Sequence, residues 1–182
     1  MAEAVAEHFD VDKIHAAHRQ LNVAIRLHFA GDDPVAVLTL AWAAAAIFTG
    51  LANHRCPERS WDEQAQEANG LSPKDYFAII RRGQNFLKHA DKDPEDAIHW
   101  SVDDTEALIM GACINAGLLD GLSPSAYVFK RWYIAKYRSK FPADWEPGGE
   151  ATKFFPNLAQ MPDEEQRAFD ARRVDEVEAQ AG

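Results

Sequence analysis

The sequence predicts an all-α protein, an antiparallel bundle of about five main helices with a C-terminal extension. Apolar residues recur at helical spacing, for example at Ile14, Leu21 and Ile25. Capping residues followed by proline divide the chain, because proline is tolerated at the first position of a helix. No segment shows the alternation of apolar and polar β-branched residues that is typical of strands. Short connections between the expected helices favour antiparallel neighbours.

The expected helix ends follow from local signals. Asp10 or Asp12 can cap the first helix, and the turn at residues 31–34 ends it and begins the next one. Residues 60–63 have the form of a capping box, and residues 69–70 close the short helix that it opens. The expected helices run over about 10–30, 34–55, 61–69, 73–90, 103–119 and from 124 to near 142.

The chain of 182 residues is expected to form one domain with flanking segments, since single hydrophobic cores usually run to roughly 100–200 residues. We expect residues 1–9 to be frayed or disordered and residues 10–141 to form the helical bundle. Residues 142–182 are expected to be an acidic extension that wraps the bundle and is partly disordered. Proline and glycine punctuate this segment, and its apolar residues are sparse.

The segment from Val35 to Ala52 contains no charged residue and just reaches the length of about 18 residues that a membrane-spanning helix needs. It is rich in alanine and contains two threonines and a glycine, so it would insert poorly. We therefore expect a central core helix and no membrane partner. The N-terminal sequence lacks the basic and apolar regions of a secretory signal, so a cytoplasmic location is expected.

The formal net charge of the chain is −10 at pH 7. This acidic total argues against a protein that coats nucleic acid by charge alone, since such binding requires clustered lysine and arginine side chains. A local basic patch remains compatible with the total charge.

The most informative segment is residues 81–91, with the sequence RRGQNFLKHAD. On a helix, Arg82, Asn85 and His89 fall within about 60° of one another, because successive residues turn by about 100°. The apolar residues of the same helix occupy a separate sector that should face the core. The sequence therefore predicts a rigid helix that carries three aligned polar groups away from the core.

These residue types suit the cleavage of RNA by its own 2′-hydroxyl group. His89 can titrate near neutral pH and act as an acid or a base. Arg82 can bind the phosphate and stabilise charge in the transition state, and Asn85 can orient either group. No metal is required. The plain alternative is that Arg82 pairs with an acid such as Asp91 while His89 interacts with the end of its helix.

Residues 82–89 read Arg-x6-His, which resembles the Arg-x4–6-His signature of the HEPN superfamily of helical bundles. The string NFLKHADKDP at residues 85–94 is also similar to a set of uncharacterised bacterial helical proteins with an Asn-Phe-x-Lys-His-Ala-Asp motif. This second similarity extends over about residues 11–141, whereas the HEPN motif covers only eight residues. Two positions depart from the HEPN pattern: Gly83 follows the arginine, where a polar residue is common, and Asn85 lies three positions after the arginine.

The resemblance implies an HEPN-like module that binds RNA or cleaves it without a metal, with Arg82 and His89 as catalytic residues and Asn85 in support. Many HEPN proteins are endoribonucleases of toxin–antitoxin or phage-defence systems. The resemblance therefore also implies a homodimer, with the arginine and histidine of both chains at one interface, and an antitoxin or regulatory protein as partner. The alternative is a non-catalytic helical protein that oligomerises or regulates through the same face.

The last expected helix contains five basic residues and no acid between residues 126 and 140, interleaved with aromatic residues. This mixture suits single-stranded RNA, because bases stack on aromatic rings while cations pair with phosphates. The alternative is that the rings are buried and the long basic side chains extend to solvent. Together with Lys88, the expected RNA-binding residues are Lys130, Arg131, Lys136 and Arg138.

His15 and His18 lie three positions apart, as zinc ligands on one helix can, but no HExxH motif accompanies them. We therefore expect no metal. The sequence also lacks a glycine-rich phosphate loop, and no cofactor is expected. A small-molecule sensor is a third interpretation, which a ligand-sized cavity lined by Trp42 and Phe48 would indicate.

Overall fold

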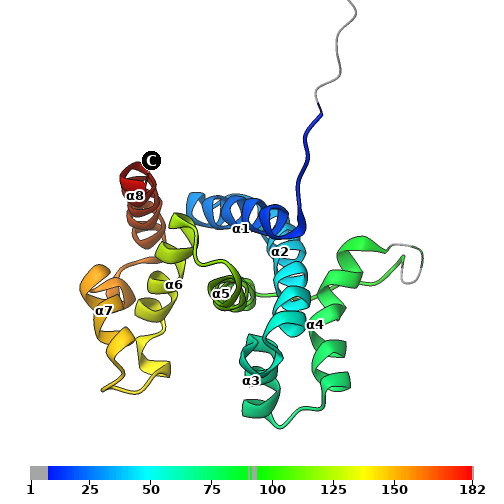
Figure 1. Cartoon of the computed structure of the whole chain (residues 1–182). Helices are drawn as coiled ribbons and strands as arrows, with labels where there is room; N and C mark the ends of the chain where they lie inside the picture. Colours follow the sequence, from blue (N-terminus) through cyan, green and yellow to red (C-terminus); the bar gives the residue numbers. More distant parts are fainter. Residues whose placement is uncertain (1–7, 90, 92–93, 182) are drawn as a thin grey trace, which may run out of the picture.

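The computed structural model describes residues 8–89, 91 and 94–181, and these contain eight α-helices and no strand (Figure 1). The all-α prediction is confirmed, although the number of helices is eight instead of about five. The helices are α1 (Lys13–Ala30), α2 (Pro34–Arg55), α3 (Trp61–Asn69), α4 (Pro73–Lys88), α5 (Val102–Leu119), α6 (Pro124–Lys136), α7 (Glu146–Phe154) and α8 (Asp163–Ala181). Short 3₁₀ turns follow α2, α6 and α7 at Pro57–Arg59, Arg138–Lys140 and Leu158–Gln160.

Side-chain caps begin most of these helices at the expected positions. The side chains of Asp33, Ser72 and Ser123 each accept a hydrogen bond from a backbone N–H in the first turn, and a proline follows each of them. Helix α5 begins slightly earlier than expected, because Ser101 and Asp104 form a capping box. Helix α6 ends at Lys136 and is followed by a 3₁₀ turn at Arg138–Lys140, short of the expected end near residue 142.

Helix α5 lies at the centre of the arrangement, with α1, α2 and α6 around it (Figure 1). Helix α2 packs along both α1 and α5 and buries Ala41, Trp42 and Phe48 among other side chains. By length and composition alone α2 could cross a membrane, and 44% of its most apolar window is buried within the fold. Its packing against α1 and α5 supports the core helix that its alanine-rich sequence predicts.

Residues 142–182, expected to be a partly disordered extension, include helices α7 and α8. Helix α7 packs against α6, and α8 packs against both α1 and α6. The stripe that α8 buries contains Gln166, Asp170 and Val174, at four-residue spacing. Two of these three residues are polar, so the apolar periodicity that marks a packed helix is missing from the sequence. Helices α3, α7 and α8 account for the difference between the eight helices observed and the five main helices that the sequence predicts.

Two glycines within helices have opposite surroundings. A Cβ atom added at Gly111 on α5 would lie 2.7 Å from the indole Cδ1 and Nε1 atoms of Trp61. A Cβ atom added at Gly50 on α2 would have nothing within 4 Å. The contact between α3 and α5 therefore requires glycine at position 111, whereas position 50 has room for a side chain.

We expect Gly111→Ala to lower the free energy of unfolding by about 1–3 kcal/mol, because it overpacks the contact with Trp61. Gly50→Ala should raise the free energy of unfolding by about 0.5–1 kcal/mol, the ordinary gain in helix propensity. Equilibrium unfolding in urea measures both changes. Equal effects of the two substitutions would contradict the contact between Gly111 and Trp61.

Asp170 lies on the buried side of α8, with 0% of its surface exposed. Within the described part of the chain, no hydrogen bond of good geometry reaches either carboxylate oxygen. Burial raises the pKa of Asp170 from an ordinary value of 3.8 to about 8, and the nearby Trp132 N–H and Lys136 ammonium oppose this increase. The folded protein therefore keeps a proton on Asp170 at pH values where the unfolded chain has lost it.

This bound proton makes the free energy of unfolding depend on pH. Because the folded-state pKa of Asp170 is raised, its contribution to stability is complete below about pH 4 and is lost as the pH rises through about 8. Asp170→Asn should remove this loss of stability. The variant should therefore become more stable relative to wild type as the pH rises from about 4 to about 8. Asp175→Asn is the control, since Asp175 is an exposed acid on the same helix. Parallel pH profiles for wild type and Asp170→Asn would contradict the assignment.

Candidate functional site

Helix α4, which carries the predicted Arg-Asn-His face, lies at the edge of the molecule beyond α2 (Figure 1). The residues that α4 buries are Tyr76 and Gly83. A Cβ atom added at Gly83 would lie 3.1 Å from Nε1 of Trp42 and 3.2 Å from Cζ3 of Trp100. Glycine at this position lets α4 pack directly against two indole rings. This contact gives a packing reason for the departure from the HEPN pattern at position 83.

Arg82 and Asn85 are both exposed on α4. Arg82 forms no hydrogen bond or ion pair with any other described residue. The alternative interpretation paired Arg82 with Asp91, but the ion pair that the structure gives Asp91 is with His89. The guanidinium group of Arg82 is therefore accessible to an anion from outside this part of the chain.

His89 follows the last helical residue, because α4 ends at Lys88, two residues before the expected end. Its backbone N–H still donates to the Asn85 carbonyl at 3.0 Å, so its Cα continues the helical path. Its φ of −131° and ψ of 99° are extended, which turns the side chain away from the direction that a helical residue would have. The imidazole Nδ1 lies 3.9 Å from Oδ1 of Asp91. The backbone of α4 thus fixes the position of His89 but not the direction of its ring.

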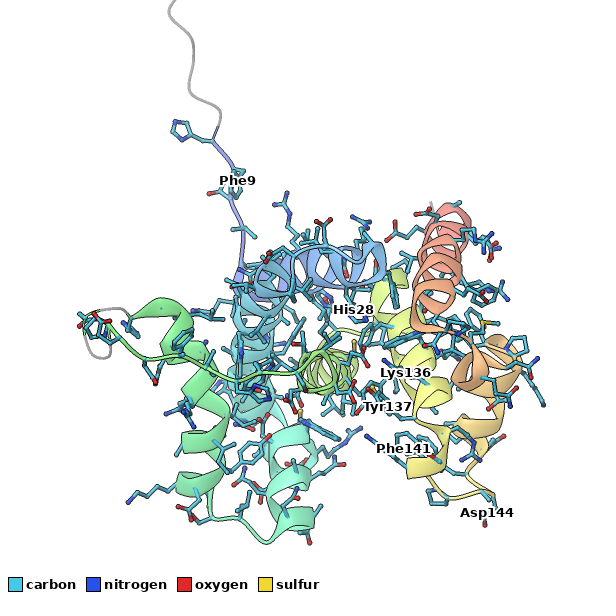
Figure 2. All side chains as sticks on the ribbon, turned by 180° about the vertical axis from the view of Figure 1, so that it is seen from behind. Phe9, His28, Lys136, Tyr137, Phe141 and Asp144 are labelled. Atoms are coloured by element: carbon cyan, nitrogen blue, oxygen red, sulfur yellow. The ribbon has the colours of Figure 1, made fainter. Side chains whose placement is uncertain are left out.

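Lys136, expected to bind RNA, belongs instead to a buried polar cluster between α1, α5 and α6. Its ammonium lies 2.9 Å from both carboxylate oxygens of Glu106, which is 1% exposed. The Tyr137 hydroxyl donates to Glu106 at 2.7 Å, and Nε2 of His28 lies 3.5 Å from the same carboxylate. Figure 2 shows His28, Lys136 and Tyr137 near one another in the interior. Burial raises the pKa of Glu106, while Lys136 and Tyr137 oppose that increase.

The other basic residues of α6 do not form one surface with those of α4. Arg138 donates to three backbone carbonyls at residues 141–143 and so holds the turn after α6. The guanidinium carbon of Arg131 lies 3.6 Å from the centroid of an aromatic ring on its own helix, and Lys130 is half-buried. Helices α4 and α6 lie on opposite sides of α2 and α5 in both views (Figures 1 and 2). Lys88 on α4 is therefore separated from the predicted RNA-binding residues of α6.

A cleft of about 730 Å³ lies between α4 and the core, lined by residues of α2, α3, α4 and α5. This volume falls in the range of about 300–1,000 Å³ that is typical of small-molecule sites. Trp42 lines the cleft, as the sensor interpretation expected, whereas Phe48 does not line it and is buried in the core. The aromatic residues of its walls are Trp42, Trp61, Tyr76, Phe77 and Trp100.

Asp62 provides a carboxylate in this cleft and is 3% exposed. Its Oδ2 accepts hydrogen bonds from the Thr49 hydroxyl at 2.8 Å and the Asn115 amide at 3.1 Å. Its Oδ1 accepts a hydrogen bond from the Tyr76 hydroxyl at 3.2 Å. Burial and the neighbouring Asp62 raise the pKa of Tyr76, so this hydroxyl keeps its proton and acts as a donor. Helices α2, α3, α4 and α5 thus meet at one carboxylate.

Sequence reasoning did not identify the polar network around Asp62. Asp62 lies in the first turn of α3, where an acid commonly stabilises the helix N-terminus, so its position suggested no further role. The available signal was Thr49 and Asn115, which are polar residues within otherwise apolar helical segments. Buried polar side chains need hydrogen-bond partners, so such residues indicate a partner elsewhere in the fold.

The chain matches none of the protein-family models, curated proteins or solved structures with which it was compared. The resemblance to the HEPN superfamily therefore depends on the motif at residues 82–89 alone. Across residues 8–89, 91 and 94–181, no group of three or more histidine, cysteine or acidic side chains is arranged to hold a metal ion.

Removal of Lys136 would leave Glu106 as a buried acid without its cation. We expect Lys136→Met to lower the free energy of unfolding by about 3–5 kcal/mol, as is typical when one partner of a buried ion pair is removed. Lys130→Met is the matched control on the same helix, because the described residues provide no ion pair for Lys130. Thermal and urea unfolding measure both variants. If Lys136→Met lowers the free energy of unfolding no more than Lys130→Met does, the ion pair between Lys136 and Glu106 contributes nothing to stability.

Proposed function

We propose that the C-terminal half of α4 binds RNA and cleaves it without a metal ion, as HEPN-like endoribonuclease modules do. The observation that carries this proposal is the exposed guanidinium of Arg82, which has no partner in the described part of the chain. An unpaired arginine can hold a phosphate through two parallel hydrogen bonds. Asn85 and Lys88 are exposed on the same half of the helix and can contribute to binding an anion.

In the proposed reaction His89 acts as the general base or general acid. It takes the proton from the 2′-hydroxyl group that attacks the phosphate, or gives a proton to the leaving oxygen. Its side chain is 45% exposed, so a substrate can reach it. Arg82 stabilises the charge that develops on the phosphate oxygens. Asn85, three residues after Arg82, orients one of these groups or donates a hydrogen bond to the phosphate.

A second copy of the chain completes the proposed site. Ile79 is 59% exposed and lies three residues before Arg82, on the same side of α4. An exposed apolar residue beside the cationic group suits a two-fold contact between copies of α4, because a two-fold interface uses the same patch on both chains. The Arg82 and His89 side chains of both copies then lie at one interface. A cytoplasmic location and an antitoxin or regulatory protein as partner belong to the same proposal.

The second candidate is a non-catalytic protein that oligomerises or regulates through the same face. The exposed Ile79 favours it, because an apolar contact between two copies requires no chemistry. This candidate predicts a dimer that neither binds nor cleaves RNA. The two candidates therefore predict different results when the same protein is mixed with RNA. The first predicts binding or cleavage, and the second predicts neither.

The test incubates wild-type protein, Arg82→Ala and His89→Ala with mixed RNA in the presence of EDTA. We expect cleavage to fall by about 100-fold or more in each variant, the usual contribution of an acid or base or of a charge-stabilising donor. Circular dichroism should show that both variants stay folded, because both side chains are exposed. Matched controls lie at the end of α2, where His54 and Arg55 are also exposed. His54→Ala and Arg55→Ala should keep the activity of wild type.

Cleavage that persists in both Arg82→Ala and His89→Ala would contradict the proposed site. Binding of RNA that depends on Arg82, without any cleavage, would support the binding surface and reject the nuclease. A dimer that Ile79→Asp disrupts and that ignores RNA would favour the non-catalytic candidate. Analytical ultracentrifugation measures the oligomeric state in the same buffer.

A further inference from the structure

The cleft between α4 and the core is separate from the proposed RNA surface. Arg82, Asn85 and His89 are absent from its lining, whereas Ile79, Ile80, Arg81 and Gln84 of the same helix contribute to it. Ile79, proposed above as a dimer contact, is thus shared by the two surfaces, whereas the proposed RNA-binding and catalytic side chains are not. Helix α4 therefore contributes to two surfaces, the exposed face that carries Arg82 and the cleft.

Aromatic rings from four separate segments form much of the cleft wall. The ring centroids of Trp42 and Trp100 are 5.7 Å apart, and those of Tyr76 and Phe77 are 5.3 Å apart. Trp61 contributes a third indole from α3. The faces of such rings attract both apolar groups and cations. This lining favours a ligand with an aromatic or apolar body.

Asp62 adds a buried negative charge to the aromatic wall. It is 3% exposed, and no described lysine, arginine or histidine forms an ion pair with it. Buried charges are normally paired, because removing an ion from water is unfavourable. Oδ2 of Asp62 already accepts two hydrogen bonds and Oδ1 accepts one, so Oδ1 has the capacity for one more donor. A protonated amine supplies both the positive charge and that donor.

The other charged groups that line the cleft are exposed. Arg81 lies over the Phe77 ring, with 5.1 Å between its guanidinium carbon and the ring centroid. Asp104 is part of the capping box that begins α5, and His99 is exposed in the segment before it. Water screens the charges of exposed groups, so their effect on a buried ligand is weak. Asp62 therefore determines the preferred charge inside the cleft, and it disfavours an anion.

We propose that this cleft binds a small organic cation, a protonated amine attached to an aromatic or apolar body. The ammonium group donates to Oδ1 of Asp62, and the body packs against Trp42, Trp61 and Trp100. The proposal does not rest on RNA binding or cleavage, because it uses none of the residues assigned to that function.

Three probes of nearly equal size test the charge preference of the cleft in the full chain. They are 2-phenylethylammonium, the neutral 2-phenylethanol and the anionic 3-phenylpropanoate. Tryptophan fluorescence and isothermal titration calorimetry measure each dissociation constant. We expect the ammonium to bind at least about tenfold more tightly than the alcohol, which corresponds to roughly 1.4 kcal/mol. The carboxylate should bind most weakly.

Substitutions of cleft residues test whether the preference for the ammonium arises in the cleft. Asp62→Asn should abolish the tenfold preference for the ammonium, because it removes the charge and keeps the size of the side chain. Glu63→Gln is the matched control, since Glu63 is an exposed acid on the same helix that does not line the cleft. Ala46→Leu adds bulk at an exposed lining position on α2 and should weaken the ammonium and the alcohol alike.

The proposal is overturned if wild type binds the ammonium and the alcohol equally, prefers the carboxylate, or binds none of the probes. A preference for the ammonium that persists in a folded Asp62→Asn variant would overturn the role of Asp62. If Asp62→Asn does not fold, Ala46→Leu tests where the probes bind. Unchanged affinity in that variant would place the probes outside the cleft and overturn the proposal. None of these measurements uses RNA, so their failure is distinguishable from failure of the proposed RNA function.

Discussion

Helices α1, α2 and α5 pack closely together, and this packing positions α6 on one side of them and α4 on the other (Figure 1). Small side chains form much of the contact among these helices, and alanine loses no side-chain entropy when it is buried. Larger aromatic residues lie on either side of this alanine-rich centre. Toward α6 they are enclosed by α8, whereas toward α4 they line a cleft. The buried alanines are Ala17 and Ala24 on α1, Ala41, Ala44, Ala45 and Ala52 on α2, and Ala112 and Ala116 on α5.

Elements that depend on local chemistry could be predicted from the sequence. The caps at Asp33 and Ser123 hydrogen-bond within their own first turns, so their signal is contained in three or four residues. Helix α8 could not be recognised as a packed helix, because its buried side includes Gln166 and Asp170 in place of apolar residues. The Gln166 amide donates to two backbone carbonyls before α8, which compensates its burial in a way that no local pattern encodes.

For the candidate site, only the features that follow from helical periodicity could be predicted from the sequence. The exposure of Arg82 follows from that periodicity, but the ring direction of His89 depends on where α4 ends, and helix ends are set by short-range details of the backbone. The sequence does not reveal the ion pair of Lys136, because its partner Glu106 lies thirty residues away in the sequence. The carboxylate of Asp62 likewise gathers donors from three other helices, and such contacts arise only when the chain is folded.

The small number of buried residues on α4 has a mechanical consequence. Tyr76 and Gly83 are the buried residues of this 16-residue helix, so few buried contacts would oppose a tilt of the helix as a whole. A rod of that length extends over about 24 Å, and a tilt of about 10° around its first turn would displace its far end by roughly 4 Å. Such a tilt would change the width of the aromatic cleft and the position of Arg82 together. A molecule that widened the cleft would therefore move Arg82 and Asn85, which do not line it, without touching them.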